Sequence, residues 1–362
     1  MLRYLSFLLY PFSMLYGLIM WLRNRFYDKG VLSAVEFDLP VIAVGNLSVG
    51  GTGKTPHVEY LIRLLKDYFR IATLSRGYNR KTKGFFLADG QSTAAEIGDE
   101  PMQFHQKFPG ISVCVGEERM LAIPQLLMER PYIQAILLDD AFQHRSVKPG
   151  KNIMITEYNR PFTHDHVVPF GRLREGRSGY KRADVIIVSK CPANLTVTEK
   201  ERFYREIDPL PHQRLFFTSL KYGGLYNMLD AEPVQLPANA TVLAVCGIAR
   251  PEPLVQHLKQ QFANVYLLPF PDHYYYSRKD LEKIKLELEK TDGTPKIIVT
   301  TEKDAVRLHL LRDIIKELQL PIAVIPVEIS FLFNEADSFN NYIFDYVAGS
   351  GASLETTPLV QE

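Results

Sequence analysis

The chain has 362 residues, a formal net charge of +1 and 46% apolar residues. This length suits two domains of about 100–200 residues each, and the apolar share supplies sizeable cores, which argues against a disordered chain. The near-zero net charge gives no basic field for a nucleic-acid partner. Cys114, Cys191 and Cys246 are isolated, without metal-type spacing, and fit a reducing, cytosol-facing location.

Residues 2–21 form a nearly continuous apolar and aromatic segment, followed by Arg23 and Arg25. Because a small-residue cleavage site is missing, the segment is not typical of a signal peptide. It barely reaches the roughly 20 residues of a membrane span, and Pro11 and Gly17 interrupt it. A helix lying in the membrane interface fits at least as well, and packing on the protein's own core is a third possibility. We expect residues 1–29 to form a membrane-associated helix.

Residues 40–65 predict a strand, a glycine-rich turn and a helix. The run 40–44 is apolar, and the apolar positions of 57–65 recur at helical spacing. The turn between them contains Gly50, Gly51, Thr52, Gly53, Lys54 and Thr55. Such a turn directs backbone N–H groups and the positive end of the helix at a phosphate group. Lys54 is placed to reach the outer phosphates of a nucleotide, and Thr55 to offer its hydroxyl to Mg²⁺.

One position departs from the usual phosphate-loop pattern, because its first glycine is Ser48 here. The alternative is a glycine-rich surface loop with a chance Gly-Lys-Thr. The strand before the turn and the helix after it favour the phosphate loop.

Short apolar runs alternate with helical stretches along the rest of the chain, a pattern that predicts an α/β fold with a mainly parallel sheet. The expected strands are 40–45, 71–75, 112–115, 135–138, 152–156, 184–189, 241–246, 264–268, 296–300 and 322–327. Glycines and prolines in 220–240 indicate a boundary. We therefore expect a P-loop NTPase-like core domain at 30–220, a smaller α/β domain at 225–345 and a flexible tail at 346–362.

Carboxylates follow the apolar strand 135–138. In phosphate-loop proteins a carboxylate at the end of a neighbouring strand holds Mg²⁺ or its waters, and Asp139 is better placed for this than Asp140. Gln143 and His144 follow at the same sheet edge. A strand that ends in a solvated turn has the same pattern, so the paired carboxylates are informative only together with the glycine loop.

Two further positions suggest acid–base chemistry. Asp99 stands where a helix begins, which is more often a capping position, yet a phosphoryl acceptor hydroxyl needs a base and kinases commonly use Asp. His273 follows Asp272 at a strand end and is able to form an oriented acid–base pair, although a lone histidine is more often structural. Glu175 is the one acid in the basic stretch 172–182, where it either pairs with its neighbours or joins the Mg²⁺ shell.

These motifs together resemble the tetraacyldisaccharide 4'-kinases of lipid A biosynthesis. The resemblance covers most of the chain, and its matching segments are 25–28, 45–56, 75–78, 98–101, 139–144, 173–175, 182–184, 246–248, 272–273 and 301–305. The family's own loop lacks the first glycine, so Ser48 is no objection. The chain departs from the family at Ala141, usually glycine, and at Arg172, usually proline.

The resemblance implies ATP and Mg²⁺ as cofactors, and transfer of the γ-phosphate to the 4'-hydroxyl of a tetraacyldisaccharide 1-phosphate to form lipid IVA. It makes Asp99 the general base, oriented by His273, with Asp139 and Asp140 also catalytic. It assigns Thr55, Asp139 and Glu175 to the metal. The nucleotide contacts that it implies are Gly50, Gly51, Thr52, Gly53, Lys54, Thr55, Gln143, His144, Arg119 and Arg174.

The resemblance also implies a location. We expect the protein at the bacterial inner membrane, held peripherally or by its single N-terminal helix, with the active site facing the cytoplasm. The expected partners are a lipid A disaccharide precursor and the membrane lipid surface, with no nucleic acid and no obligate protein partner.

Two alternatives remain open from the sequence. One is a P-loop GTPase or metallochaperone, but the nearest stretch to a guanine-specificity motif, 189–192, has Pro192 in place of the needed aspartate. The other is a membrane-attached nucleotide sensor without turnover, which leaves Asp99 and His273 without a role.

Overall fold

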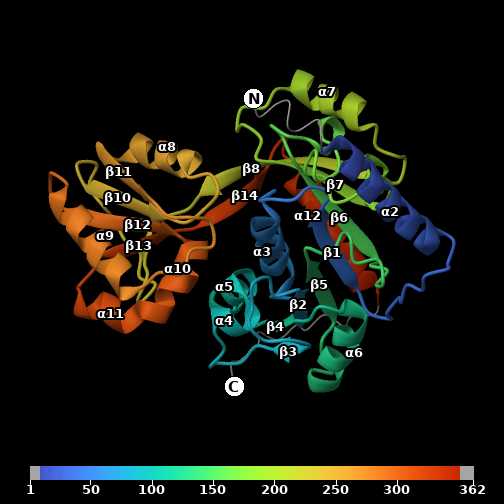
Figure 1. Ribbon diagram of the computed structural model, residues 1–362, viewed down its shortest axis with the longest axis horizontal. Coiled ribbons are helices and arrows are strands. Elements are labelled where there is room, and N and C mark those ends of the chain that lie inside the picture. The colour runs from blue at the N-terminus through green and yellow to red at the C-terminus, as the bar shows by residue number, and fades with distance from the viewer. Residues whose placement is uncertain (1–8, 351–362) are drawn as a thin grey trace. The chain divides into compact units, whose positions relative to one another are not determined.

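The computed structural model describes residues 9–350, which form two compact units (Figure 1). Within that range the first unit comprises residues 9–91, 104–220 and 329–350, and the second comprises 92–103 and 221–328. Each unit is built on its own β-sheet, so each is described by itself.

The sheet of the first unit has nine strands in the order β14-β8-β7-β6-β1-β5-β2-β4-β3. The strands are β1 Val41–Asn46, β2 Ile71–Ser75, β3 Phe86–Leu87, β4 Ser112–Val115, β5 Ala135–Asp139, β6 Lys151–Glu157, β7 Val185–Ser189, β8 Arg214–Tyr222 and β14 Val327–Phe331. From β8 to β4 every neighbouring pair is parallel. Strands β1, β2, β5 and β7 are buried along their whole length, as in sheets covered on both faces.

Helices supply the apolar residues that bury this sheet. The helices of the first unit are α2 Tyr10–Asp28, α3 Lys54–Leu65, the end of α5 Asp99–Lys107, α6 Arg119–Glu129, α7 Val197–Ile207 and α12 Ala336–Gly349. Residues of α6 pack with β1, β2, β4 and β5 in one core, and residues of α7 pack with β6, β7 and β8 in another.

The second unit has a five-stranded sheet in the order β11-β10-β12-β13-β9, parallel except for β9. Its strands are β9 Tyr226–Asn227, β10 Thr241–Cys246, β11 Asn264–Pro269, β12 Lys296–Thr301 and β13 Ile322–Ile325. Its helices are α4 Ala94–Ile97, the start of α5, α8 Glu252–Gln261, α9 Arg278–Lys290, α10 Glu302–Leu308 and α11 Arg312–Glu317. Residues of α9, α10 and α11 fill one core of the sheet and residues of α8 the other.

The predicted α/β fold with a mainly parallel sheet is confirmed, and all the predicted strands are present. The sequence analysis did not predict β8, or the short strands β3, β9 and β14. Two segments also belong elsewhere than their place in the sequence suggests, because residues 92–103 join the second unit and residues 329–350 return to the first.

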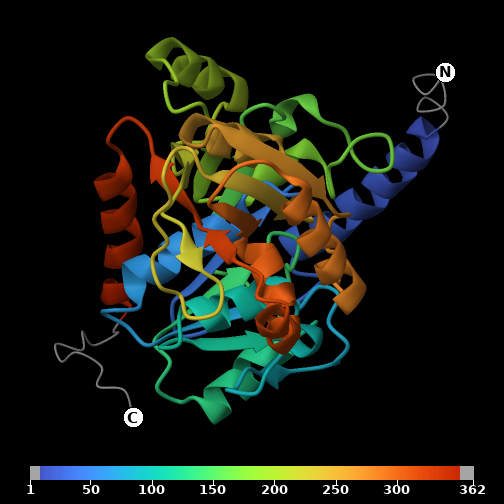
Figure 2. The ribbon, with the colours of Figure 1, turned by 90° about the vertical axis from the view of Figure 1, so that its left-hand side faces the viewer.

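The return of α12 to the first unit has a clear physical cause. Its Phe339 ring packs 6.1 Å from the ring of Tyr60 on α3, and its Asn340 accepts a hydrogen bond of 2.8 Å from the Tyr60 hydroxyl. Figure 2 shows α12 in red beside α3 in light blue. The expected tail therefore begins inside a helix, and its residues 351–362 lie outside the described residues.

Helix α2 is the expected N-terminal helix, although residues 1–8 lie outside the described part. Pro11 occupies its first turn, where a missing N–H breaks no helical hydrogen bond. Within residues 9–350 no helix has the length and apolarity needed to cross a membrane. Several large apolar side chains of α2 are nevertheless exposed: Tyr10, Phe12, Met14, Leu15, Leu18, Ile19, Trp21, Leu22 and Phe26.

Candidate active site

The glycine-rich turn joins β1 to α3, as the sequence predicts. Gly50 and Gly53 have φ angles of +106° and +91°, a region that favours glycine and lets the chain turn sharply into the helix. Lys54 and Thr55 are the first two residues of α3. The turn thus lies at the carboxyl end of a central parallel strand, where ligands bind in open α/β sheets.

Asp139 and Asp140 lie beside this turn. The parallel register pairs Asp139 with Val44 of β1, so its buried carboxylate is at the same sheet edge as the loop. Asp140 Oδ1 is 3.4 Å from Lys54 Nζ, and both Asp140 oxygens accept hydrogen bonds of 3.0 Å from Arg174. Burial raises the pKa of Asp140, but the charges of Lys54 and Arg174 outweigh burial and hold it below its usual range.

Gln143 and Glu175 continue the same network. Gln143 Nε2 donates to the Asn46 carbonyl at 2.9 Å and to Glu175 Oε1 at 3.0 Å. Glu175 is 1% exposed, and both of its oxygens accept from Arg182, at 2.7 and 3.0 Å. Its Oε2 also accepts from Asn24 of α2 at 2.6 Å. These contacts make Glu175 the junction between α2 and the loop region.

The contacts of α2 with this network are more numerous than the sequence suggested. Arg23 donates to the Gln143 carbonyl at 2.9 Å, and the Tyr16 hydroxyl donates to the Arg174 carbonyl at 3.1 Å. Asn24 was not among the candidate residues, because a single asparagine in an apolar helix carries no recognisable signal.

Arg119 is buried and His144 is half-buried, and the charge of Asp140 acts on both side chains. Arg119 begins α6 and donates to the Gly116 carbonyl, while its Nε and Nη2 have no hydrogen-bond partner within residues 9–350. Burial lowers the pKa of Arg119 to about 10, although the charges of Asp139 and Asp140 oppose this. Burial, together with the Arg119 charge, lowers the pKa of His144 to about 4, so this ring is neutral.

A preformed metal cluster is absent from the described residues, since no group of three or more His, Cys, Asp or Glu side chains has the arrangement of a metal site there. Thr55, Asp139 and Glu175 as metal ligands therefore stay a prediction. The described contacts of Glu175 are all with side chains that donate to it.

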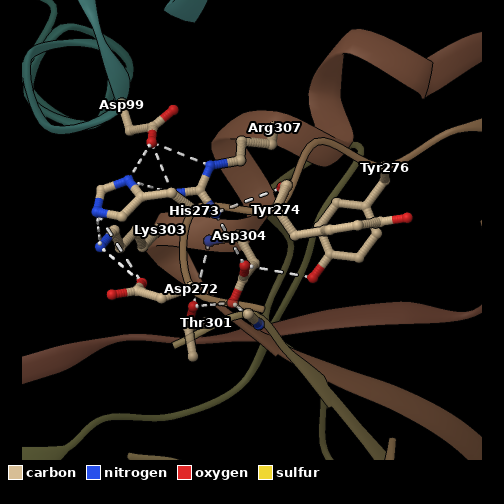
Figure 3. Close-up of polar contacts among 10 residues, drawn as sticks. Asp99, Asp272, His273, Tyr274, Tyr276, Thr301, Lys303, Asp304 and Arg307 are labelled. Atoms are coloured by element: carbon tan, nitrogen blue, oxygen red, sulfur yellow. Dashed lines mark hydrogen bonds and ion pairs between the residues drawn. The ribbon is translucent and has the colours of Figure 1, made fainter. Parts of the chain in front are cut away.

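The second unit gathers Asp99 and His273 around a buried arginine (Figure 3). Asp99 is 4% exposed, and its Oδ2 accepts from His273 Nδ1 at 3.1 Å and from Arg307 Nε and Nη2 at 3.0 and 2.6 Å. Its other oxygen, Oδ1, is buried and has no hydrogen-bond partner among residues 9–350. Oδ2 thus accepts three hydrogen bonds, whereas Oδ1 accepts none from the described residues.

The neighbours of Asp99 keep its carboxylate ionised and hold the His273 ring in place. Burial raises the pKa of Asp99, but hydrogen bonds from His273 and Arg307 outweigh burial and hold the pKa below its usual range. Lys303 Nζ lies 3.1 Å from His273 Nε2. Arg307 Nη2 lies 3.2 Å from the other ring nitrogen, Nδ1, so both nitrogens of the ring have a cationic neighbour while Nδ1 also contacts Asp99.

Helix α10 places the two cations of this cluster. Thr301 caps the helix by accepting from the Asp304 amide, and its hydroxyl donates to Asp304 Oδ2 at 2.7 Å. The Gly247 amide donates to the same oxygen at 3.0 Å, which ties α10 to the end of β10. Lys303 and Arg307 then project from successive turns toward His273 and Asp99 (Figure 3).

Sequence reasoning missed Arg307. It lies between Val306 and Leu308, and all three are buried. A buried guanidinium requires a carboxylate partner, so an arginine flanked by the apolar residues Val306 and Leu308 was the available signal. The sequence position of Asp99 favours a helix cap, but in the structure its side chain is bonded to His273 and Arg307.

Comparison with known proteins agrees with the family resemblance found in the sequence. The family model LpxK, tetraacyldisaccharide-1-P 4'-kinase, matches residues 5–347. The chain belongs to this family. A tetraacyldisaccharide 4'-kinase of Bacteroides thetaiotaomicron is 45% identical over 351 residues, which cover 94% of this chain and 92% of the relative. One of Flavobacterium johnsoniae is 44% identical over 94% of this chain and 96% of the relative.

A solved structure agrees with this family. The crystal structure described as "apo" form LpxK from Aquifex aeolicus in complex with ATP matches with a TM-score of 0.74 and 30% identity. The match covers 95% of this chain and 99% of that chain. The family, the fold class and the kinase class predicted from the sequence are confirmed, and the alternatives of a GTPase, a metallochaperone or a sensor gain no support.

Proposed function

We propose that this member of the tetraacyldisaccharide-1-P 4'-kinase family transfers the γ-phosphate of ATP to the 4'-hydroxyl of a tetraacyldisaccharide 1-phosphate in lipid A biosynthesis, and that Asp99 is its general base. The base assignment rests on the different hydrogen bonding of the two Asp99 oxygens. Oδ2 accepts three hydrogen bonds, whereas the buried Oδ1 has no partner in the described chain. Buried polar atoms without partners are rare and are expected where a substrate completes the site.

The nucleotide half of the proposal uses the first unit. Backbone amides of the loop at Gly50–Thr55 and the start of α3 bind the phosphates, and Lys54 and Arg174 offset the charge on the transferred group. The ion pairs of both cations with Asp140 orient them before substrate binds. Arg119 contributes the guanidinium nitrogens for which no protein partner is described, and Gln143 and His144 line the same sheet edge.

The residues at this edge fit a Mg²⁺ ion that is shared with the nucleotide. Mg²⁺ prefers oxygen ligands, and it usually keeps several waters and takes only one or two protein carboxylates together with phosphate oxygens. The Thr55 hydroxyl at the start of α3 and the buried Asp139 carboxylate at the end of β5 are such a donor set. A Mg²⁺ ion held by these residues would offset the negative charge of the phosphate oxygens. Glu175 supports this region through Gln143.

The acceptor half uses the second unit. Asp99 is ionised at neutral pH, so Oδ1 is able to accept the proton of the 4'-hydroxyl. A carboxylate whose pKa is held low is a weak base, but phosphoryl transfer has a loose transition state in which little proton removal is needed early. His273 Nδ1 and the guanidinium of Arg307 fix the orientation of the carboxylate.

Helix α2 supports peripheral binding at the bacterial inner membrane, with the active site on the cytoplasmic side. Its exposed aromatic and aliphatic side chains are those expected of an interfacial helix, with Arg23 and Arg25 beside them. Trp21 is the only tryptophan of the chain and is 57% exposed, so it reports on this helix alone. We expect vesicles of phosphatidylglycerol to shift its fluorescence to shorter wavelength. An unchanged spectrum would show that this face does not enter lipid.

The activity is tested by incubating the protein with γ-labelled ATP, Mg²⁺ and a tetraacyldisaccharide 1-phosphate in mixed micelles. We expect label at the 4' position of the non-reducing glucosamine, and no comparable transfer from GTP. Equal use of GTP, or label released only as free phosphate, would contradict the proposal.

A further inference from the structure

Three consecutive carbonyl groups of the phosphate loop are each held by a different side chain. The Gly51 carbonyl accepts from Lys190 Nζ. The Thr52 carbonyl accepts from Ser189 Oγ at 2.7 Å, which is closer than the Thr156 carbonyl, 3.1 Å from the same hydroxyl, and the Gly53 carbonyl contacts His57 Nδ1 at 2.7 Å. We call His57, Ser189 and Lys190 the loop brace.

These bonds determine which way the amides of the loop point. In a trans peptide the C=O and the following N–H are directed oppositely. With the carbonyls of Thr52 and Gly53 turned toward the brace, the amides of Gly53 and Lys54 face the other way. The Thr52 amide, opposite the Gly51 carbonyl, donates to the Gly50 carbonyl at 3.1 Å. The brace therefore sets the direction of the groups that a phosphate would contact.

His57 is suited to this task because its ring is neutral and its tautomer is fixed. A carbonyl only accepts, so Nδ1 carries the hydrogen that is donated to Gly53. Nε2 is then an acceptor and receives the Thr218 hydroxyl at 3.0 Å. Burial lowers the pKa of His57 to about 4, so the ring stays neutral at physiological pH. Helix α3 is thereby tied both to its own first turn and to β8.

Lys190 is suited to bracing for a different reason. Its ammonium group lies 2.6 Å from Oε1 of Glu157, a carboxylate that is 6% exposed. This pairing offsets the lysine charge and holds the side chain at the Gly51 carbonyl. The backbone of Lys190 has a φ of +56°, which a lysine adopts at an energetic cost. The stretch 189–192 was compared above with a guanine-specificity motif. Its Ser189 and Lys190 instead donate to carbonyls of the phosphate loop.

We propose that His57, Ser189 and Lys190 are positioning residues of the nucleotide site, which preset the phosphate loop by holding its carbonyls outward before ATP binds. The inference rests on the proposed function, since it requires the loop to bind ATP. A preset loop loses less conformational freedom on binding, so the brace contributes to nucleotide affinity.

The test uses two substitutions that each remove one donor, Ser189→Ala and Lys190→Met. We expect each to weaken ATP binding, measured by calorimetry with Mg²⁺, by about tenfold, the size of effect expected for one buried hydrogen bond. We also expect faster hydrogen exchange of the amides of Gly53 and Lys54 in the free protein. Thr73→Val is the matched control, because it removes a buried hydroxyl from the middle of β2 that has no described partner within residues 9–350.

Steady-state kinetics separates positioning from a merely structural role. The brace variants should raise KM for ATP about tenfold, with KM for the disaccharide unchanged and kcat within about threefold. General loss of stability would instead lower the active fraction and leave both KM values alone. If Ser189→Ala does not fold, Lys190→Met and the charge-retaining Lys190→Arg carry the test, with Lys190→Arg expected to bind ATP more tightly than Lys190→Met.

The outcomes also separate the brace from the proposed function. If Lys54→Ala binds ATP as the parent does, the loop is not the nucleotide site and the proposed function fails. If Lys54→Ala loses ATP while Ser189→Ala and Lys190→Met bind within twofold of the parent, the nucleotide site stands and the brace is refuted.

Discussion

The phosphate loop and the Asp99 cluster are built in opposite ways. The loop is one continuous stretch, Gly50–Thr55, whose working groups are largely backbone amides. The cluster is assembled from side chains at the start of α5, in the turn after β11 and on α10 (Figure 3). A site made of backbone is recognisable in the sequence as a motif, whereas a site made of side chains from distant segments depends on the fold.

Lys54→Ala should have the largest effect, because it removes a charge placed against the transferred phosphoryl group. We expect kcat/KM for ATP to fall by about 10³-fold, with KM for the disaccharide unchanged. Steady-state rates measured with each substrate varied in turn check this. A loss of kcat/KM under tenfold would mean that Lys54 of the loop contributes little to phosphoryl transfer.

Asp99→Asn should impair the Asp99 cluster and leave the phosphate loop intact. The amide keeps the shape of the side chain but is no base, so we expect kcat to fall by about 10²-fold. The Kd for ATP, measured by calorimetry, should stay within twofold. Asp313→Asn, at an exposed position of α11, is the control and should behave as the parent. Loss of ATP affinity in Asp99→Asn would show that the two sites are not separable.

Between pH 6.5 and 4, acid should weaken the first unit more than the second, where burial also lowers the pKa of His257 and His309 but by less. Burial lowers the pKa of His57 from 6.5 to about 4, so between these values the unfolded chain binds a proton that the folded chain does not. His57 alone should therefore lower the stability of the first unit as the pH drops through this range, by about 2 kcal/mol at pH 5, and His144, whose pKa is also lowered to about 4, adds to the loss. Asp99 has a pKa below its usual 3.8, so its contribution is lost only below that value.

Hydrogen exchange measured at pH 7 and pH 5 checks this difference. Amides of α3 should lose more protection at pH 5 than amides of α10. Equal losses in both helices would contradict the assignment of the larger effect to His57 and His144 of the first unit.

Arg307→Lys should give the smallest effect, because it keeps the charge and loses the two-pronged contact with Asp99. We expect kcat to fall about fivefold. Weaker hydrogen bonding lets the Asp99 pKa rise, so the acid limb of the kcat–pH profile should move up by about half a pH unit. A profile that moves toward lower pH, or an unchanged kcat, would remove Arg307 from the positioning of Asp99.

Much of the fold could be predicted from the sequence, because buried parallel strands are short apolar runs, and all those expected are present. β8 was missed although Arg214–Tyr222 contains such a run, since charged and polar residues flank it. The return of α12 could not be predicted, because it depends on long-range packing such as that of Phe339 on Tyr60.

The two candidate sites also differed in how much of each could be predicted from local sequence. The loop residues and Asp139 were found from local pattern alone. Arg307, Lys190 and Asn24 were not assigned their contacts, because a charged or polar residue that is buried by distant segments has the same local sequence as one at the surface. Asp99 and His273 were paired through the family resemblance, and their hydrogen bond of 3.1 Å agrees with that pairing.

The bond between Asn24 and Glu175 has a practical consequence for inhibitor discovery. Removing the N-terminal helix is a common way to make a lipid-binding enzyme easier to purify. In this protein such a truncation would also remove one of the two donors to Glu175 Oε2, leaving Arg182, and the Arg23 donor to the Gln143 carbonyl. Compounds selected on the shortened enzyme would meet the proposed nucleotide site without these two contacts, and their potency should be re-measured on the enzyme that retains the helix.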